Sequence, residues 1–561
     1  MTELGATAGP ADTVDTVVGS MGLGPRTLER PHEAGGTLTG VLAGRNPAVI
    51  DGAGLISPIG VAWSLDWWIG GEDRWYLPAR EATTRQRRVG AGPVVETMIS
   101  LPGGSARQLA YGALVGGREV TVVEVYNDSP VPVALGLAVR PYSWTGERVS
   151  ELTISLDDRI IFVDGQPALV LPRPANDSGG SAGRDLLTAV MAHDALGWDG
   201  GVAMTQGSGA NAVAIYPLPH KTSLRLLVLG AGTDGVAARR WEPGSGPEPS
   251  QAPDGEGVSR GWTSVVNAGG HFEFPDNGIA GTFEGARSRL LLASPTLAGE
   301  VAELRSGSGA LLMGLALGGH RSEIGPVLDA LALGFPTRLD DGPVAGAEVV
   351  AAIGVALDSL GRRPWAGLLE TAAQIAHLVE RAGDDDAAAV ARRGLARLAT
   401  LSGDESGAAH LAKGSGRNQA GDLATVATLM EEASSTGAWS RAGLADDPVA
   451  AARFLVAARS LLIDDGGDDL VLLPGFAAAW RGANVELNDV PTRFGRLSFG
   501  IRWHGHRPAL LWQLDGESPA PTIRCPDLDA EWSTTEARGE ALLVGSDHAG
   551  PSTGQVGDSS S

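Results

Sequence analysis

The chain has 561 residues, a formal net charge of −23 at pH 7 and a hydrophobic content of 43%. This length exceeds one ordinary hydrophobic core and predicts two or three domains, and the hydrophobic content is typical of a folded protein. A strongly acidic protein repels phosphate backbones and anionic lipid headgroups. We therefore expect neither nucleic acid nor a membrane surface as a partner.

The cysteine content and the first residues bear on the cellular compartment. Cys525 is the only cysteine, which excludes an internal disulfide and a disulfide-stapled secreted fold. The N-terminus is acidic and lacks both the positive segment and the apolar run of a signal peptide. No apolar run reaches the roughly 20 residues that span a bilayer. We expect a cytoplasmic protein.

The N-terminal half has the pattern of an antiparallel β structure. Residues 1–35 lack periodicity and predict a flexible arm. Residues 119–126 and 133–139 are rich in β-branched and apolar residues, and the turn-forming residues 127–130 between them predict a hairpin. Similar short strands recur between Gly, Pro and Asp, so we expect a large antiparallel β super-sandwich over residues 36–285.

The middle of the chain, residues 286–465, has a helical period. Apolar residues recur every three or four positions in segments that begin at Val349, Leu368 and Val390. The breaks between these segments are short, which predicts antiparallel helix hairpins in a bundle or in part of a toroid. The stretch has room for about seven or eight helices of average length.

The C-terminal region returns to the strand period. We expect a small β-sandwich over residues 466–545 and a disordered tail over residues 546–561, which is rich in Gly and Ser. His504 and His506 flank a predicted hairpin turn, but no third ligand has a matching spacing, so we expect no metal. The Gly-rich segments lack a complete nucleotide-binding fingerprint, and no cofactor is expected.

Three segments near the C-terminus carry a family resemblance. They are residues 435–439, which end in Trp439, the predicted helix that follows Asp447 and Pro448, and the segment from Leu473 and Pro474 to Trp480. Their order resembles the end of an (α/α)6 toroid in bacterial six-hairpin glycosidases, especially the amylo-α-1,6-glucosidase (glycogen-debranching) group. A full toroid has about twelve helices, so the resemblance implies a partial toroid with a shortened helical region.

The resemblance implies a carbohydrate-active protein that acts on α-glucan or an oligosaccharide by carboxylate general acid/base chemistry of the inverting type. Such hydrolysis needs one carboxylic acid and one carboxylate on opposite sides of the glycosidic bond. The candidate catalytic residues, at predicted toroid loop positions, are Asp340, Glu432, Asp446 and Asp447. The alternative is that Asp447 caps a helix and that Glu432 ends another one on its solvated side.

A second group of candidates would contact the substrate. Residues 64–76 concentrate aromatic side chains, and the apolar faces of sugars stack on indole rings. The predicted contacts are Asp66, Trp67, Trp68, Arg74, Trp75, Trp439 and Arg441. The alternative is that these tryptophans pack in the core. A catalytically inactive pseudoenzyme, which binds glycan or offers its helical layer to a protein partner, is the second functional hypothesis.

Overall fold

The computed structural model describes residues 36–142, 152–157, 159–182, 186–192, 196, 203–207, 209–230, 246–412, 426–428, 448–516 and 521–545. The chain divides into two compact units. The sandwich unit contains Met1–Ser264 and Glu432–Asp447, and the helical unit contains Val265–Glu431 and Pro448–Ser561.

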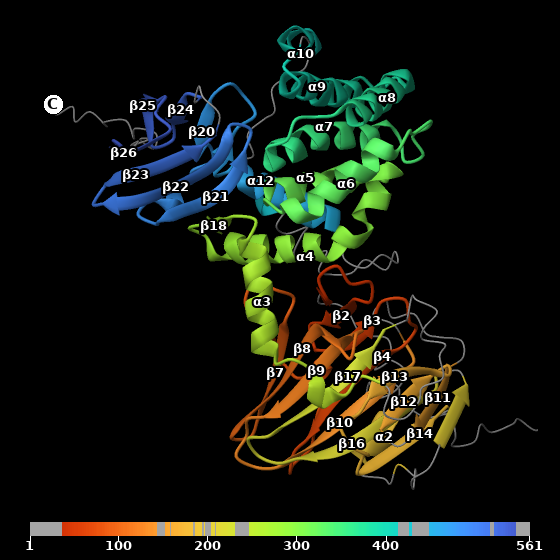
Figure 1. Ribbon diagram of the computed structural model, residues 1–561. Helices are drawn as coiled ribbons and strands as arrows, with labels where there is room; N and C mark the ends of the chain where they lie inside the picture. Colours follow the sequence, from red (N-terminus) through yellow and green to blue (C-terminus); the bar gives the residue numbers. More distant parts are fainter. Residues whose placement is uncertain are drawn as a thin grey trace, which may run out of the picture. The chain divides into compact units, whose positions relative to one another are not determined.

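Two antiparallel sheets form the sandwich unit (Figure 1). The first has the order β1-β2-β3-β4-β10-β16-β14, and β5 pairs with β4. Its strands are β1 (Gly36–Thr39), β2 (Ala48–Asp51), β3 (Ile56–Pro58), β4 (Ser64–Gly70), β5 (Trp75–Tyr76), β10 (Val133–Arg140), β14 (Asp177–Ser181) and β16 (Asn211–Leu218).

The second sheet has the order β15-β11-β12-β13-β17-β9-β8-β7-β6. Its strands are β6 (Arg85–Arg88), β7 (Val95–Leu101), β8 (Gly104–Val115), β9 (Arg118–Asn127), β11 (Leu152–Asp157), β12 (Ile160–Val163), β13 (Gln166–Val170), β15 (Ala203–Gly207) and β17 (Ser223–Leu229). Gly116 and Gly117 join β8 to β9 with positive φ angles of 57° and 77°, as a tight two-residue hairpin turn requires.

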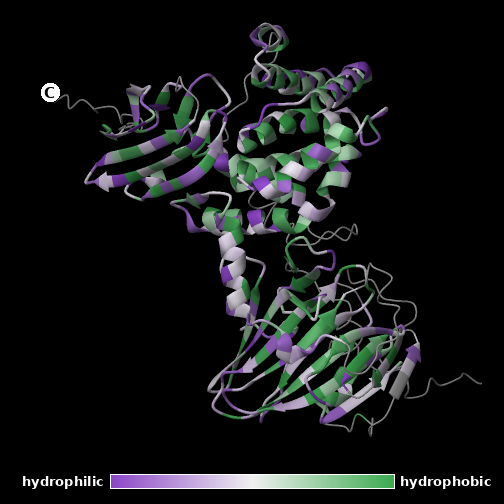
Figure 2. Ribbon diagram, in the orientation of Figure 1, coloured by the Kyte–Doolittle hydropathy of each residue, from purple (hydrophilic) through white to green (hydrophobic). Residues whose placement is uncertain are grey.

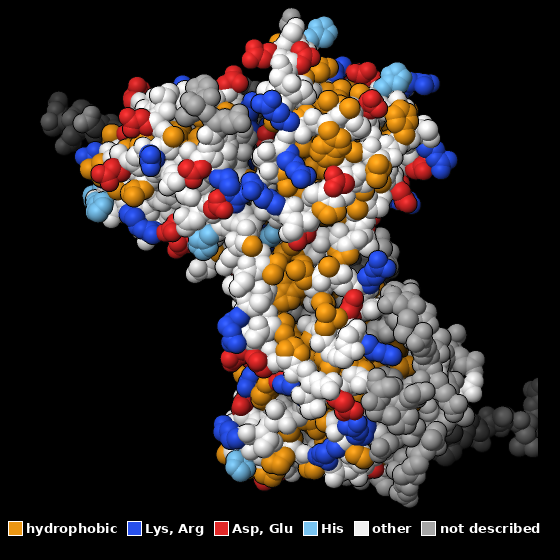
Figure 3. All heavy atoms as spheres, viewed as in Figure 1, with side chains coloured by type: hydrophobic (Ala, Val, Ile, Leu, Met, Phe, Trp, Pro, Cys, Tyr) orange, Lys and Arg blue, Asp and Glu red, His pale blue; other side chains and the backbone are white. Residues whose placement is uncertain are grey.

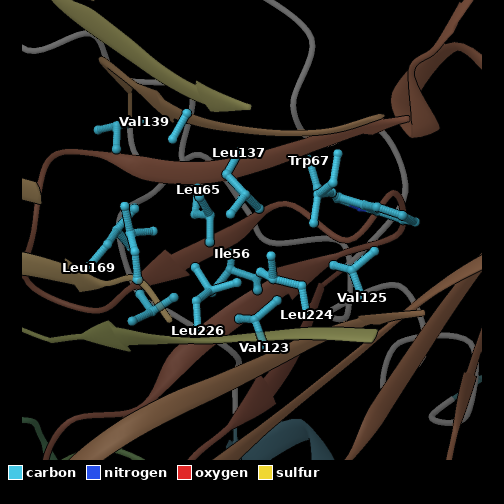
Figure 4. Close-up of a cluster of buried hydrophobic side chains, with 14 of the residues drawn as sticks. Ile56, Leu65, Trp67, Val123, Val125, Leu137, Val139, Leu169, Leu224 and Leu226 are labelled. Carbon is cyan, nitrogen blue, oxygen red and sulfur yellow. The ribbon is translucent and has the colours of Figure 1, made fainter. Parts of the chain in front are cut away.

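The main core of the sandwich unit lies between the two sheets. Trp67 and Leu137 of the first sheet and Val123 and Leu226 of the second belong to one buried cluster (Figure 4). Burial of these apolar side chains supplies the main driving force for pairing the sheets. The large antiparallel sandwich predicted from the sequence is therefore present.

One local prediction in this half is wrong. Strands β9 and β10 do not form a hairpin, because β9 pairs with β8 and β17 whereas β10 pairs with β4 and β16. Asn127 shapes the connection: its Oδ1 accepts the backbone N–H of Ser129 at 3.0 Å, and its Nδ2 donates to the carbonyl of Leu218 at 3.0 Å. The turn residues mark a reversal of the chain, but they carry the chain from one sheet to the other.

Residues 255–267 form helix α3 (Gly255–Asn267), inside the range that the sequence assigned to the β super-sandwich. The backbone N–H of Gly257 donates to Oδ1 of Asp254 at 2.6 Å, which caps the first turn. Trp262 and Val266, four residues apart, are both buried. Glycine and serine in the first turns hid this helical spacing.

Helices packed in two rows form most of the helical unit. One row contains α12 (Pro448–Ser460), α5 (Ser308–Leu317), α7 (Pro343–Leu360) and α9 (Asp385–Leu401), each next to the following one. The other row contains α4 (Asn277–Ala302), α6 (Arg321–Leu333) and α8 (Ala366–Ala382), and α10 (Glu405–Ala412) packs on α9. This arrangement is an antiparallel hairpin layer of the partial-toroid type.

Glycines set the close spacing of the first row. A Cβ atom on Gly309 of α5 would lie 2.5 Å from the carbonyl carbon of Glu348 in α7, and one on Gly394 of α9 would lie 2.7 Å from the carbonyl oxygen of Val350. Only glycine permits such an approach of helix backbones. Helix α7 is long and apolar enough by composition to cross a membrane, but 61% of it is buried between its neighbours, as expected for a core helix. Figure 2 shows the hydrophobic residues that run along these helices.

Two small sheets complete the helical unit. The larger has the order β18-β21-β22-β23-β26 and the smaller the order β19-β20-β24-β25. Their strands are β18 (His271–Glu273), β19 (Ile463–Asp464), β20 (Leu470–Leu472), β21 (Val485–Thr492), β22 (Gly495–His504), β23 (Arg507–Asp515), β24 (Ile523–Cys525), β25 (Asp529–Thr534) and β26 (Arg538–Leu542). The predicted hairpin turn at residues 504–508 joins β22 to β23. The fold is thus multidomain β + α: a large antiparallel sandwich, a helical hairpin layer and C-terminal β sheets.

Candidate functional site

A small pocket of about 40 Å³ opens in the sandwich unit. Strands β2, β4 and β10 of the first sheet supply Asp51, Asp66 and Arg140, and the short helix η2 (Pro78–Arg80) and α2 (Leu186–Met191) contribute to its walls. The lining includes the charged or aromatic side chains of Asp51, Asp66, Trp68, Arg80, Arg140 and Tyr142. Such a gathering of ionisable and aromatic groups in a concavity is the usual mark of a ligand site.

Asp51 ends β2 and is 2% exposed. Its Oδ1 accepts the backbone N–H groups of Ala53 at 2.9 Å and Leu55 at 2.7 Å, in a turn that Gly54 closes with a φ of 84°. Burial raises the pKa of Asp51 to about 7, and the nearby charge of Asp66 raises this pKa as well. Asp51 can therefore donate or accept a proton near neutral pH.

Asp66 lies in the middle of β4 and is held by its two neighbours. Its Oδ1 accepts the backbone N–H of Trp67 at 2.9 Å, and its Oδ2 accepts the indole N–H of Trp68, also at 2.9 Å. Trp68 is 1% exposed, so its ring forms part of the pocket wall and orients the carboxylate. Of the predicted contact residues, Asp66 and Trp68 therefore line the pocket.

Two arginines line the same pocket as the two carboxylates. Arg140, at the end of β10, is 1% exposed, and its guanidinium carbon lies 5.5 Å from the ring centroid of Trp68 and 5.7 Å from that of Tyr142. Arg80 contributes a second guanidinium to the lining. Carboxylates and guanidiniums in one recess can form charge-assisted hydrogen bonds with hydroxyl groups. The volume holds a few water molecules, so it fits hydroxyl groups of a ligand better than a whole ring.

Three of the predicted substrate contacts lie elsewhere. Trp67 is fully buried between the sheets and donates its indole N–H to the carbonyl of Ala53 at 3.0 Å. Trp75 is 9% exposed and packs with Trp68, Leu77 and residues of α2. Both faces of β4 are covered, one by the second sheet and the other by this cluster. Neither ring is therefore open to stacking by a sugar.

Arg74, the third of these predicted contacts, binds the carboxylate of Glu81. It forms two hydrogen bonds with the Glu81 carboxylate, at 2.6 and 3.0 Å, and its guanidinium lies 4.0 Å from the ring centroid of Tyr76. It does not line the pocket. A strand with two buried faces cannot be recognised from its aromatic content alone, which explains these misassignments.

Asp340 lies in the helical unit, in the connection between α6 and α7. Its side chain is 54% exposed and forms an ion pair of 2.8 Å with Nε of Arg338. The neighbouring Asp341 accepts the backbone N–H of Ser306, just before α5, at 2.8 Å. A Cβ atom on Gly307 would lie 2.4 Å from a methyl carbon of Val449, so the starts of α5, α7 and α12 share one end of the helical array.

The remaining predicted site residues lie outside the described part of the chain. These are Glu432, Trp439, Arg441, Asp446 and Asp447. Among the described residues, no group of three or more His, Cys, Asp or Glu side chains is placed to hold a metal ion. His504 and His506, at the β22–β23 turn, are both exposed.

Sequence reasoning missed Asp51, Arg80, Arg140 and Tyr142 as members of one site. The available signals were an aspartate that follows an apolar strand directly and an arginine at the end of the apolar strand β10. Charged residues at such positions are rarely buried unless they are paired, and burial of both residues points to a function or a polar network. Strands β2 and β10 are far apart in sequence, so the pattern could not show that these residues meet.

Comparisons with known proteins add the following findings. No protein-family model and no curated protein matches the sequence. Among solved structures, the chain is similar to a bacterial glucoamylase complexed with acarbose, with 11% identity, 68% of this chain and 65% of that chain covered, and a TM-score of 0.46. It is also similar to a family GH92 α-mannosidase from Bacteroides thetaiotaomicron, with 8% identity, 65% and 57% coverage, and a TM-score of 0.29.

A second structure of that mannosidase, in complex with mannoimidazole, has 8% identity, 66% and 63% coverage, and a TM-score of 0.24. The chain thus spans less than two thirds of the length of each of these structures. None of the three is described as a debranching enzyme.

Proposed function

We propose that this chain is a carbohydrate-active protein that binds an α-glucan or a related oligosaccharide at the sandwich pocket. The observation that carries the proposal is the convergence of two aspartates and two arginines on a recess with aromatic walls, formed by Asp51, Asp66, Arg80 and Arg140. A neutral polyhydroxylated ligand suits this set, because each hydroxyl group both donates and accepts hydrogen bonds.

The second part of the proposal is hydrolysis. The proposed acid and base come from among Asp340, Glu432, Asp446 and Asp447, as the resemblance of the C-terminal segments to six-hairpin glycosidases implies. Inverting hydrolysis places the two carboxyl groups about 6.5 to 9.5 Å apart, with a water molecule between one of them and the sugar. The glucoamylase and the mannosidase are glycosidases by name, but the proposal rests on the pocket and, for hydrolysis, on the family resemblance of the C-terminal segments.

Binding and turnover are tested separately on the purified full-length chain. Glycogen, limit dextrin and malto-oligosaccharides are incubated with the protein, released reducing sugar is measured, and binding is followed by gel retardation and calorimetry. The proposal expects binding that Asp66→Asn weakens, and reducing sugar whose release Asp446→Asn or Asp447→Asn abolishes while the fold is retained. The proposal would be refuted if the protein bound none of these glycans and released no reducing sugar from them.

A second candidate function is an inactive glycan-binding scaffold. Three exposed apolar side chains favour it: Leu333, Phe335 and Val344 at the α6–α7 connection are 90%, 64% and 54% exposed. Figure 3 also shows hydrophobic side chains on the visible face of the helical array. Large apolar side chains that lie together and are more than half exposed are characteristic of protein-contact surfaces. Glycan binding without any release of reducing sugar would select this candidate over the enzyme.

A further inference from the structure

Strand β26 forms one edge of the larger C-terminal sheet (Figure 1). Among the described strands it pairs only with β23, in antiparallel register. Its residues Arg538, Glu540 and Leu542 are exposed. An uncovered strand edge offers a row of backbone N–H and C=O groups to another strand. The edge therefore raises the question of which strand it fits.

The hydrogen bonds to β23 show which backbone groups face the open side of β26. The carbonyl of Ala537 accepts a bond from β23 at 2.7 Å, and the amide of Leu543 donates one to β23 at 2.9 Å. The backbone groups of successive residues in an antiparallel pair point alternately toward the partner strand and away from it. The amides and carbonyls of Arg538, Glu540 and Leu542 therefore point to the open side.

Side chains cover one end of this edge. Nη2 of Arg507 donates to the carbonyl of Leu542 at 3.1 Å, and Oδ2 of Asp529 accepts the amide of Val544, also at 3.1 Å. The outward amides and carbonyls of residues 538–540 have no such partner within the described chain. The part of the edge that remains available for pairing is therefore short and well defined.

Two opposite charges stand at this available part. Arg538 and Glu540 are two residues apart, so their side chains lie on the same exposed face of the sheet. Neither side chain forms an ion pair or a hydrogen bond with another described residue. A strand that brought a carboxylate opposite Arg538 and a guanidinium opposite Glu540 would complement both charges.

The β26 strand of a second copy has this charge pattern. In an antiparallel pair with a twofold axis at Gly539, Arg538 of each copy lies opposite Glu540 of the other. Both residues have outward backbone groups, so this register forms two hydrogen-bonded residue pairs and two cross-strand ion pairs. An axis at Arg538 or at Glu540 would instead place like charges opposite each other, which is destabilising.

We propose that β26 pairs with the β26 strand of a second copy of this chain, in a twofold dimer with Arg538 opposite Glu540. A twofold contact uses the same surface on both copies and ends after two chains. The full chain has a net charge of −23, but the charges at this edge cancel across the axis. The contact is small, so a dissociation constant of about 1 to 100 µM is expected. The dimer is independent of the proposed carbohydrate function.

Sedimentation equilibrium of the full-length protein, at concentrations on both sides of this dissociation constant, tests the dimer. Arg538→Glu and Glu540→Arg should each raise the dissociation constant at least about tenfold, because each replaces two attractive pairs by two repulsive ones. The matched control Arg363→Glu makes the same charge change at an exposed position after α7 and should dimerise normally. A monomer at all concentrations, or a dimer that persists in both strand variants, would overturn the proposal.

A mixture of the two variants tests the register through a gain of association. In the mixed pair, two carboxylates of one copy lie opposite two guanidiniums of the other, so heterodimers with about the affinity of the unmodified protein are expected. The double variant Arg538→Glu, Glu540→Arg exchanges the charges and should dimerise by itself. Failure of both the mixture and the double variant to dimerise would refute the register.

Hydrogen exchange on the unmodified protein is a measurement that needs no variant. The amides of Arg538 and Glu540 should exchange more slowly as the protein concentration passes through the dissociation constant. The amides of Gly539 and Ala541 point toward β23 and should exchange equally at all concentrations. Unchanged exchange at Arg538 and Glu540 in a sample that sedimentation shows to be dimeric would place the contact elsewhere and refute the proposal.

Discussion

Arg397 of α9 binds the carboxylate of Asp358, near the end of α7, through both Nε and Nη2. The aspartate side chain is 7% exposed and the arginine 23% exposed. Burial raises the pKa of Asp358 to about 6, whereas the charge of Arg397 opposes this rise. The pair therefore joins two adjacent helices of the first row and also neutralises a buried charge.

Removal of one partner is expected to cost more than the pair contributes as a whole. Arg397→Met should lower the free energy of unfolding of the helical unit by about 3 kcal/mol, because it leaves a buried carboxylate without its ion-pair partner. The double variant Asp358→Leu, Arg397→Met should recover most of that loss. Denaturant unfolding measures the stability of the single and the double variant. A double variant no more stable than Arg397→Met would contradict the expected cost of an unpaired buried carboxylate.

The buried carboxyl of Asp51 predicts a pH dependence of the sandwich unit. Its pKa rises from 3.8 to about 7 on folding, so between these pH values the folded state binds more protons than the unfolded state. Stability from this group is fully present below pH 4 and is lost as pH rises through 7. Asp51→Asn should flatten the decline between pH 4 and 7 in chemical denaturation curves, and an unchanged slope would argue against a raised pKa.

Asp66 is expected to matter for binding more than for stability. Asp66→Asn removes a negative charge from the pocket and should weaken oligosaccharide binding at least about tenfold, the usual effect of losing a hydrogen bond to a charged group. Asp177→Asn, at an exposed position of β14 in the same sheet, is the matched control and should bind normally. Calorimetric titration with malto-oligosaccharides measures the affinity of both variants. If Asp66→Asn bound as tightly as the unmodified protein, the pocket would have no part in the proposed function.

The close helix contacts predict opposite effects of one substitution at two glycines. Gly394→Ala should lower stability by about 1 to 3 kcal/mol, because its methyl group would meet the backbone of α7 at 2.7 Å. Gly299→Ala, inside α4 and with open space around the new methyl group, should raise stability by about 0.5 to 1 kcal/mol through helix propensity. Urea unfolding measures the change in unfolding free energy for each variant. Changes of the same sign in the two variants would refute the packing argument.

The sequence by itself determined the order of the three regions and the type of most of their elements, helix α3 excepted. Periodicity is a local property, so the short strands between turn residues, the amphipathic spacing around Leu368 and the hairpin turn after His504 could all be recognised from neighbours along the chain. The sequence also indicated the shortened helical layer, since the number of residues between the two β regions limits the number of helices.

Only the tertiary structure decided which side chains are accessible and which ones meet. Trp67 and Trp68 point to opposite faces of β4, and both faces are covered by elements distant in sequence, so composition could not tell a stacking platform from a core. Asp51 and Arg140 reach one pocket because β2 and β10 lie in the same sheet. Burial and convergence are non-local properties that depend on how separate segments pack, and this is why the pocket emerged only from the folded chain.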